Sequence, residues 1–210
     1  MTRTSFTLYI SGVGGQGILW LSKVIAKAAC ISQPFVCRTE MRGLSQRGGS
    51  VCSAVRFGSD ILTPTCAMGG ADLIVALDAL EAARSLGFLK TGGRLLTNVQ
   101  FSKPAHLSAG SQSETELLKT RLDYLWEQSP DFYGVDFQAL AEGNPAKRMN
   151  VWVAGAASAF LTLDPGDIRN VVQESVPTSE RDVTEMAFDA AAAFMRRLKR
   201  DSQSIPHRAA

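Results

Sequence analysis

The chain has 210 residues, 45% of them hydrophobic, with 22 basic and 20 acidic side chains. This length and apolar content suit one well-buried domain, and the balanced charge gives no broad field to attract nucleic acid or an anionic membrane. No apolar run approaches the roughly 18 residues that span a bilayer, and the N-terminus lacks a signal-peptide pattern. We therefore expect one cytoplasmic domain over residues 1–200, a flexible tail over 201–210, and neither nucleic acid nor a membrane as a partner.

The cysteines and histidines do not form a metal-binding pattern. The cysteines are Cys30, Cys37, Cys52 and Cys66. They are widely and irregularly spaced, whereas zinc and iron–sulfur sites usually draw ligands from close pairs such as C-x-x-C. The histidines are His106 and His207, so a His-based metal site or a Ser-His-Asp triad is disfavoured. We expect four reduced thiols in or near the core, and no metal site on this chain.

The first part of the chain follows a strand, turn and helix pattern. Residues 7–10 form a short apolar run typical of a buried strand, and residues 12–17 read Gly-Val-Gly-Gly-Gln-Gly. Apolar residues then recur at helical spacing, at Ile18, Leu21, Ile25 and Ala28. Pro34 ends this connection, and residues 35–37 predict a second strand that leads into a polar, glycine-bearing loop.

The middle of the chain predicts further strands. Residues 51–57 alternate in character and, with residues 61–63, predict an antiparallel hairpin. Residues 71–77 are apolar apart from Asp72, as is typical of a central strand covered on both faces, and Asp78 can cap the helix that follows. Residues 94–99 predict another strand. The fold class we predict is α/β, a Rossmann-like layered domain with a mixed, mainly parallel sheet.

Helices dominate the last part of the chain. Ser113 and Glu116 fit a capping box before an apolar spacing at Leu118, Leu122, Leu125 and Trp126. Residues 151–161 are small and apolar nearly all round, which predicts a buried helix, and a short amphipathic stretch follows the break at 164–166. A last helix is expected to place one face in the core, with basic residues at its C-terminal end. The residues of that face are Val183, Met186, Ala187, Ala190, Phe194 and Leu198.

The glycine turn is the first candidate binding site. Gly12, Gly14 and Gly17 satisfy G-x-G-x-x-G between a predicted strand and helix, where backbone N–H groups and the helix dipole can hold a phosphate. Gly15 and Gln16 lie inside the same turn. In a dinucleotide-binding fold, Glu40 would take a ribose hydroxyl. The alternative is a tight turn that allows close helix packing and binds nothing.

The polar loop after the second predicted strand is the second candidate binding site. It contains Gln46, Arg47, Gly48 and Gly49. Glycines let the backbone approach a partner, and arginine supplies forked donors, so this segment predicts an anion site or an interface. An ordinary solvated loop remains the alternative. For Asp72 and Asp78, helix capping or solvation of a strand end is favoured over acid–base catalysis.

Three segments together resemble a known family. Residues 12–17, residues 46–51 (Gln-Arg-Gly-Gly-Ser-Val) and residues 71–77 are similar, in that order, to the gamma domain of pyruvate:ferredoxin and related 2-oxoacid oxidoreductases. Gly-Asn-Pro at 143–145 with Asn150, and Met-Ala-Phe at 186–188, resemble the later part of the indolepyruvate oxidoreductase beta subunit. The resemblance covers roughly residues 5–195. It departs at Thr184 and Glu185, where the family commonly has an asparagine before the Ala-Phe pair.

The resemblance implies an enzyme that decarboxylates a 2-oxoacid on thiamine diphosphate and passes electrons through iron–sulfur clusters to ferredoxin. The acyl group is transferred to coenzyme A. Thiamine diphosphate and the clusters would belong to a large alpha subunit, which fits the absence here of Gly-Asp-Gly and clustered-cysteine motifs. This chain would carry no catalytic residue and be inactive alone, while residues 12–17 and 46–49 face the partner or help form the coenzyme A region. A stand-alone Rossmann-type oxidoreductase and a ligand-free scaffold or regulatory protein are the other hypotheses.

Overall fold

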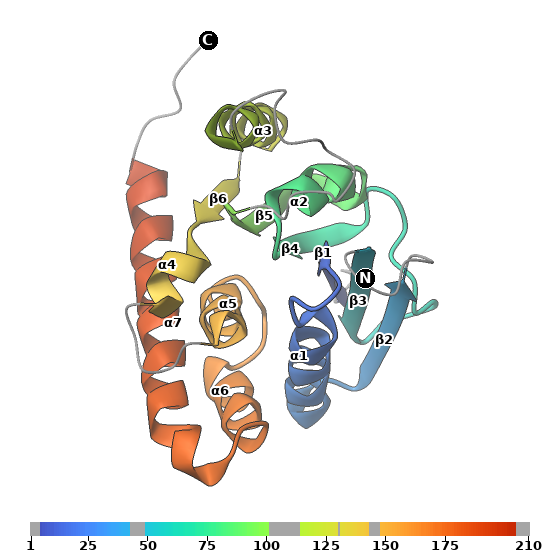
Figure 1. Cartoon of the computed structure of the whole chain (residues 1–210). Coiled ribbons are helices and arrows are strands. Elements are labelled where there is room, and N and C mark those ends of the chain that lie inside the picture. The colour runs from blue at the N-terminus through green and yellow to red at the C-terminus, as the bar shows by residue number, and fades with distance from the viewer. Residues whose placement is uncertain (1–4, 43–48, 101–113, 130, 143–147, 205–210) are drawn as a thin grey trace.

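The structure is a computed structural model that describes residues 5–42, 49–100, 114–129, 131–142 and 148–204 (Figure 1). Its strands form one six-stranded sheet in the order β2-β3-β1-β4-β5-β6. The strands are β1 (Ser5–Val13), β2 (Phe35–Arg42), β3 (Ser50–Gly58), β4 (Ala71–Ala76), β5 (Leu89–Asn98) and β6 (Phe132–Val135). β1, β4, β5 and β6 are parallel, whereas β3 runs antiparallel to both β1 and β2. The predicted mixed, mainly parallel sheet is confirmed.

The helices lie on the two faces of this sheet. They are α1 (Ile18–Ser32), α2 (Ala79–Ser85), α3 (Glu114–Gln128), α4 (Phe137–Glu142), α5 (Met149–Ser158), α6 (Pro165–Glu174) and α7 (Arg181–Ser204), with 3-10 turns at Leu86–Phe88 and Thr178–Glu180. α7 therefore continues four residues into the predicted tail, and residues 205–210 lie outside the described residues. None of the helices in the described ranges is both long enough and apolar enough to cross a membrane.

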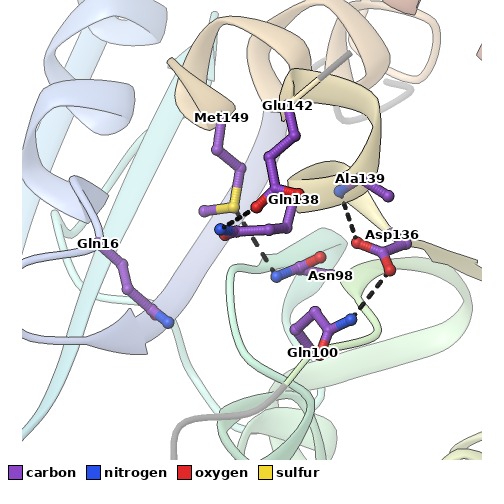
Figure 2. A pocket seen from close by; sticks show the side chains of 8 residues that line it. All are labelled: Gln16, Asn98, Gln100, Asp136, Gln138, Ala139, Glu142 and Met149. Carbon is purple, nitrogen blue, oxygen red and sulfur yellow. Dashed lines mark hydrogen bonds between the residues drawn. The ribbon is translucent and has the colours of Figure 1, made fainter. Parts of the chain in front are cut away.

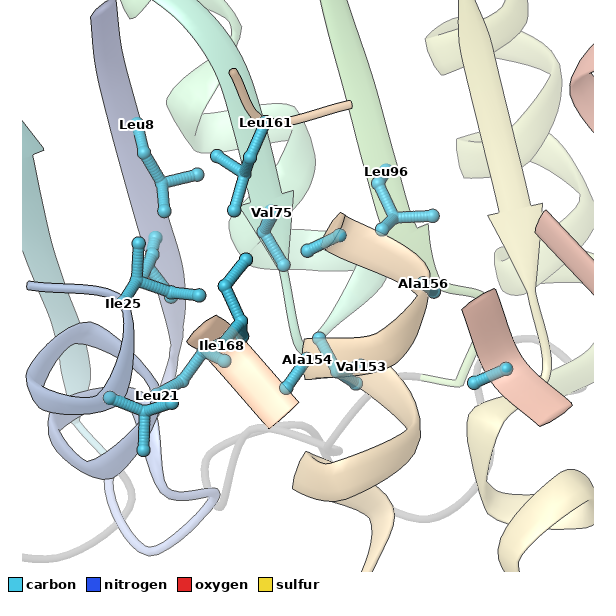
Figure 3. Packing of buried hydrophobic residues seen from close by; sticks show 14 of the residues in the cluster. Leu8, Leu21, Ile25, Val75, Leu96, Val153, Ala154, Ala156, Leu161 and Ile168 are labelled. Atoms are coloured by element: carbon cyan, nitrogen blue, oxygen red, sulfur yellow. The ribbon is translucent and has the colours of Figure 1, made fainter. Parts of the chain in front are cut away.

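The helices α1, α5, α6 and α7 cover one face and bury the larger core. Figure 3 shows Leu21 of α1 and Ile168 of α6 converging with side chains of α5 on Val75 of β4 and Leu96 of β5. Every α5 residue from Val151 to Ser158 is buried. The prediction of a buried helix is confirmed here, because a helix placed between a sheet and other helices has no polar face.

The opposite face carries α2, α3 and a smaller cluster. Tyr9 of β1, Ile74 of β4, Ala82 of α2 and Leu125 of α3 are buried together in it. Asp78 caps α2 as predicted, because its carboxylate accepts hydrogen bonds from the backbone N–H groups of Leu80 (2.8 Å) and Glu81 (3.3 Å). Trp126, expected to belong to the apolar face of α3, is 68% exposed.

The predicted hairpin of residues 51–57 with 61–63 is wrong. Both edges of β3 are already hydrogen-bonded, one to β1 and one to β2, so no edge remains for a returning strand. Residues 61–63 instead form no strand. Arg56 ties this segment down by donating to the carbonyl oxygens of Thr63 (2.5 Å) and Thr65 (3.3 Å).

The predicted core face of the last helix is also partly wrong. Ala187 is buried, but Met186, Ala190 and Phe194 are exposed, and the core instead receives Phe188, Ala191, Ala192 and Met195. α7 carries apolar residues on more than one side, so helical spacing alone does not decide which of these sides faces the core. One further expectation fails: the free thiol of Cys30 is exposed on α1 rather than in or near the core.

Candidate functional site

The candidate site lies at the carboxyl edge of the parallel strands. After β1 the chain forms α1 on one face of the sheet, and after β4 it forms α2 on the other face. β1 and β4 are neighbours, so the helices diverge between them. Such a switch point leaves a crevice outside the strand ends, where α/β proteins bind ligands.

The glycine turn at the end of β1 is closed by Gln16. The Gln16 backbone N–H donates to the Val13 carbonyl oxygen at 3.0 Å, and the Gln16 side-chain Oε1 accepts from the Val13 N–H at 2.7 Å. Gly17 has φ 85° and is the residue before α1, and Gly15 has φ 100°. Both values lie in the left-handed region that glycine adopts without strain. The turn is therefore preformed by its own side chain.

Two of the predicted site glycines are required by packing. A Cβ on Gly12 would lie 2.7 Å from Gln16 Oε1 and 3.1 Å from the Leu77 Cβ. A Cβ on Gly17 would overlap the Asn150 side-chain amide, which comes from the first turn of α5. A Cβ on Gly15, in contrast, would meet nothing within 4 Å. Gly12 and Gly17 thus allow close packing, while Gly15 leaves the turn open on one side.

The two predicted motifs meet at this turn. The Gly14 N–H donates to the Gly49 carbonyl oxygen at 2.9 Å. Gln46, Arg47 and Gly48 lie outside the described residues, so their positions stay a prediction. The exit of their loop is anchored, because the Ser50 hydroxyl donates to the buried Glu81 carboxylate of α2 at 2.5 Å.

Arg84 completes that anchor by donating to the other oxygen of Glu81 at 2.5 Å. Both oxygens of the carboxylate therefore have donors, as a buried anion requires. This arrangement joins the start of β3 to the first turn of α2. Sequence reasoning missed it, because Ser50 and Glu81 are far apart in the chain and Glu81 belongs to no motif.

A pocket of about 500 Å³ opens at the same edge (Figure 2). Figure 2 shows Gln16 on one side of it and residues of β5, α4 and α5 on the other. The lining residues are Gln16, Asn98, Gln100, Asp136, Gln138, Ala139, Glu142 and Met149. This volume lies in the range of about 300–1,000 Å³ typical of small-molecule sites.

Asn98 and Asp136 hold the walls of the pocket in place. The Asn98 side chain donates to the Leu77 carbonyl oxygen at 3.4 Å and accepts from the Phe137 N–H at 3.1 Å, which links the ends of β4 and β6. Asp136 caps α4 by accepting from the Ala139 N–H at 2.9 Å, and its other oxygen accepts from Gln100 at 2.9 Å. These polar groups are thus held in fixed positions before any ligand binds.

The pocket offers neutral hydrogen-bonding groups rather than cations. Four of its lining side chains are carboxamides and two are carboxylates, and none of the described residues that line it is basic. Carboxamides both donate and accept. The pocket therefore suits an uncharged group rich in amides or hydroxyls better than a phosphate.

The clearest pKa shifts belong to two tyrosines of the sheet and to one buried cysteine, none of which lines the pocket. Burial, followed by a hydrogen bond with Cys52, raises the pKa of the Tyr9 phenol. Burial also raises the pKa of the Cys66 thiol and of the Tyr133 phenol. These groups stay protonated at neutral pH, which does not suit Cys66 as a nucleophile, because the thiolate is the reactive form.

Glu40 does not take the position predicted for a ribose-binding carboxylate. In a dinucleotide-binding fold the second strand lies beside the first, but here β3 separates β2 from β1. The Glu40 carboxylate pairs with Arg38 at 2.5 Å on the same strand. The insertion of β3 moves Glu40 one strand away from the glycine turn, which removes the main support for a stand-alone nucleotide-binding oxidoreductase.

The described residues gather no set of three or more histidine, cysteine, aspartate or glutamate side chains that could hold a metal ion. His106, the one internal histidine that sequence reasoning weighed, lies outside the described residues. Asp72 makes structural contacts, because it accepts from the Thr7 N–H at 2.9 Å and pairs with Lys90 at 2.8 Å.

Comparison with known proteins decides the family. The model of the pyruvate ferredoxin/flavodoxin oxidoreductase family matches residues 7–196. The chain belongs to this family. The indolepyruvate oxidoreductase subunit IorB of Pyrococcus horikoshii is 34% identical over 191 residues, which cover 88% of this chain and 93% of that protein. IorB of Thermococcus kodakarensis is 33% identical, with coverage of 88% and 93%. This member of the family is therefore a small subunit of a 2-oxoacid oxidoreductase, as the sequence motifs predicted.

Solved structures of the family share the fold. Pyruvate oxidoreductase subunit PORC from Thermotoga maritima superposes with a TM-score of 0.67 at 18% identity, covering 91% of this chain and 97% of that one. The 2-oxoglutarate:ferredoxin oxidoreductase from Magnetococcus marinus, solved with 2-oxoglutarate, coenzyme A and succinyl-CoA bound, gives 0.69 at 16% identity. That match covers 93% of this chain and 32% of the longer one.

Proposed function

We propose that this subunit serves an enzyme that converts an aryl 2-oxoacid, indolepyruvate, into an acyl-coenzyme A. The match to IorB over almost the full length of both chains carries the proposal. Thiamine diphosphate and iron–sulfur clusters are held by a large alpha subunit, and electrons pass through the complex to ferredoxin. This chain contributes binding and assembly surfaces rather than a catalytic residue.

The residues of this chain do not fit an iron–sulfur cluster. Its four free thiols include exposed Cys30 and buried Cys66, and the described residues contain no group of metal-ligating side chains. Clusters need several thiolates that converge on one point. We therefore derive no step through a cluster on this chain, and we assign cluster binding to the partner.

The carboxyl edge of the sheet fits a role in binding coenzyme A. The proposed contact residues are Gly12, Gly14, Gly15, Gln16, Gly17, Gln46, Arg47, Gly48 and Gly49. The carboxamide-lined pocket beside Gln16 suits the uncharged, amide-containing arm of coenzyme A. The phosphates of coenzyme A need hydrogen-bond donors, which the backbone N–H groups at the N-terminus of α1 and the side chain of Arg47 would supply. This chain would thus orient the acyl acceptor toward the partner's reaction centre.

Reconstitution with the large subunit of the same organism tests the function. We expect the two chains to co-purify, and the complex alone to show reduction of ferredoxin that depends on both indolepyruvate and coenzyme A. The isolated chain should bind neither iron nor thiamine diphosphate in stoichiometric amount. Full activity of the large subunit without this chain would contradict the proposal, as would a complex that oxidises another 2-oxoacid class in preference to aryl substrates.

A pair of matched variants tests the pocket. Gln138 lies at the pocket and donates to Glu142 at 3.0 Å, whereas Gln173 makes a similar bond to Glu185 at 2.7 Å between α6 and α7. Loss of one neutral hydrogen bond to coenzyme A should make Gln138→Ala raise the KM for coenzyme A by about 2- to 10-fold. The kcat for indolepyruvate at saturating coenzyme A should be unchanged. Equal KM values for Gln138→Ala and Gln173→Ala would exclude this pocket as part of the coenzyme A site.

A further inference from the structure

The helix α7 is held firmly against the rest of the chain. Its inner face, which includes Phe188, Ala191 and Met195, is buried in the larger core against α5 and α6. A Cβ on Gly155 of α5 would collide with the carbonyl oxygen of Phe188, so the two backbones are in close contact. The outer face of α7 is therefore held in a fixed position on the surface of the domain.

The outer face of α7 carries an exposed apolar stripe. Met186 is 71% exposed and Phe194 is 41% exposed, and exposed Ala190 and Ala193 lie between them. Met186, Ala190 and Phe194 follow each other at intervals of four residues, and Ala193 lies three residues after Ala190, so the four share one side of the helix. An apolar strip of this kind suits contact with another protein better than contact with water.

Charge is segregated along the same helix. Residues 181–190 contain three acidic side chains and one basic side chain, whereas residues 191–200 contain four basic side chains and no acidic one. Arg169 of α6 pairs with Asp189 at 3.2 Å and with Glu185 at 3.3 Å, which balances part of the acidic half. Asp182 at one end and Arg197 and Arg200 at the other are exposed beside the apolar stripe.

We propose that this outer face of α7 packs against the same face of a second copy of the chain, with the two helices antiparallel. A twofold axis near Ala190 and Ala193 places the acidic half of each helix opposite the basic half of the other. It also brings Met186 of one copy toward Phe194 of the other. The small alanines at the centre let the helix axes approach to about 8–10 Å.

The self-complementary charge pattern favours a second copy over an unrelated partner. A twofold interface uses the same patch twice, so the patch must complement its own reverse. Parallel packing would instead place Arg197 beside Arg197 of the copy and Asp182 beside Asp182, and like charges in contact are destabilising. The antiparallel pair removes both repulsions and covers both exposed apolar side chains.

The mass of the full chain in solution tests the proposal. We expect a dimer at about 100 µM by analytical ultracentrifugation. Ala190→Glu would place two carboxylates together at the centre of the interface and should weaken the dimer by at least about 100-fold. Leu62→Glu is the matched control, because Leu62 is also a highly exposed apolar residue but lies outside α7. Both variants should keep the circular dichroism spectrum and melting temperature of the parent.

Cross-linking tests the direction of the helices. In a Cys30→Ser background, Ala190→Cys should form a dimer with a short bifunctional reagent much faster than Met186→Cys. Faster cross-linking through Met186→Cys would overturn the antiparallel arrangement, and a monomeric parent at about 100 µM would overturn the proposal. Loss of large-subunit binding by Ala190→Glu, with no change in the mass of the free chain, would assign this surface to the large subunit instead.

Discussion

The face of the sheet beneath α1, α5, α6 and α7 and the face beneath α2 and α3 have different amounts of apolar cover. On the first, thick face, one continuous cluster takes side chains from β1, β3, β4, β5, β6 and five helices. On the second, thin face, a smaller cluster is closed by α2 and α3, and α3 leaves Trp126 and Tyr124 exposed. Hydrophobic stabilisation scales with buried apolar area, so the first face should determine the global stability. The second face is the one where local opening should cost least.

The largest effect should come from the thick face. Phe188→Ala removes a buried ring from the contact between α7 and α5, which should lower the free energy of unfolding by about 3–5 kcal/mol. Urea denaturation followed by circular dichroism measures the loss. Phe35→Ala, on the exposed side of β2, removes the same group and should cost less than about 1 kcal/mol. Similar losses for both variants would show that α7 does not anchor the core.

The thin face should respond less and more locally. Leu125→Ala removes the fully buried side chain that holds α3 in the smaller cluster, and we expect a loss of about 2 kcal/mol, at the low end for a buried leucine. Hydrogen exchange should then increase in α3 while α5 stays protected. A loss as large as that of Phe188→Ala, with exchange increased throughout the chain, would mean that the two faces unfold together.

The smallest effect concerns cysteine reactivity. Burial raises the pKa of the Cys66 thiol, so at pH 8 less of it is the reactive thiolate than in a free cysteine, and the site is also covered. Cys30 is exposed on α1. Iodoacetamide labelling followed by mass spectrometry should modify Cys30 first, and Cys66 should become reactive as the pH rises or the chain unfolds. Equal labelling rates at pH 8 would show that the thin face opens freely.

Elements with local signals could be predicted from the sequence. The strand at 71–77 and its capping aspartate Asp78 were predicted because apolar continuity and the cap lie within a few residues of each other. The glycine turn was located for the same reason. Its function was harder to predict, because Gly12 and Gly17 pack against Leu77 and Asn150, which come from distant parts of the chain.

Features that depend on tertiary arrangement could not be predicted. β6 has four residues and contains Gly134, so it gives almost no strand signal. Glu40 was misassigned because strand order, not spacing, decides which residue lies next to the turn. Asn98 could have been found, since it is a polar residue near the carboxyl end of a predicted strand of a mainly parallel sheet, and that end lies at the ligand-binding edge. Glu142 and Met149 could not have been found, because they lie on α4 and α5, and only the packing of these helices in the fold brings them to the pocket.

The position of α5 and α7 late in the chain has a consequence for synthesis on the ribosome. β4 and β5 are made well before α5, whose side chains pack over Val75 and Leu96 (Figure 3), and α7, which covers α5, is the last helix of the described residues. Until α5 has been released, Val75 and Leu96 have no complete shelter from water. Domains usually fold as they leave the ribosome, but here the thick face can close only when nearly the whole chain is free. The nascent chain therefore exposes apolar, aggregation-prone surface during much of translation. A chaperone that binds apolar segments would protect the chain during this time.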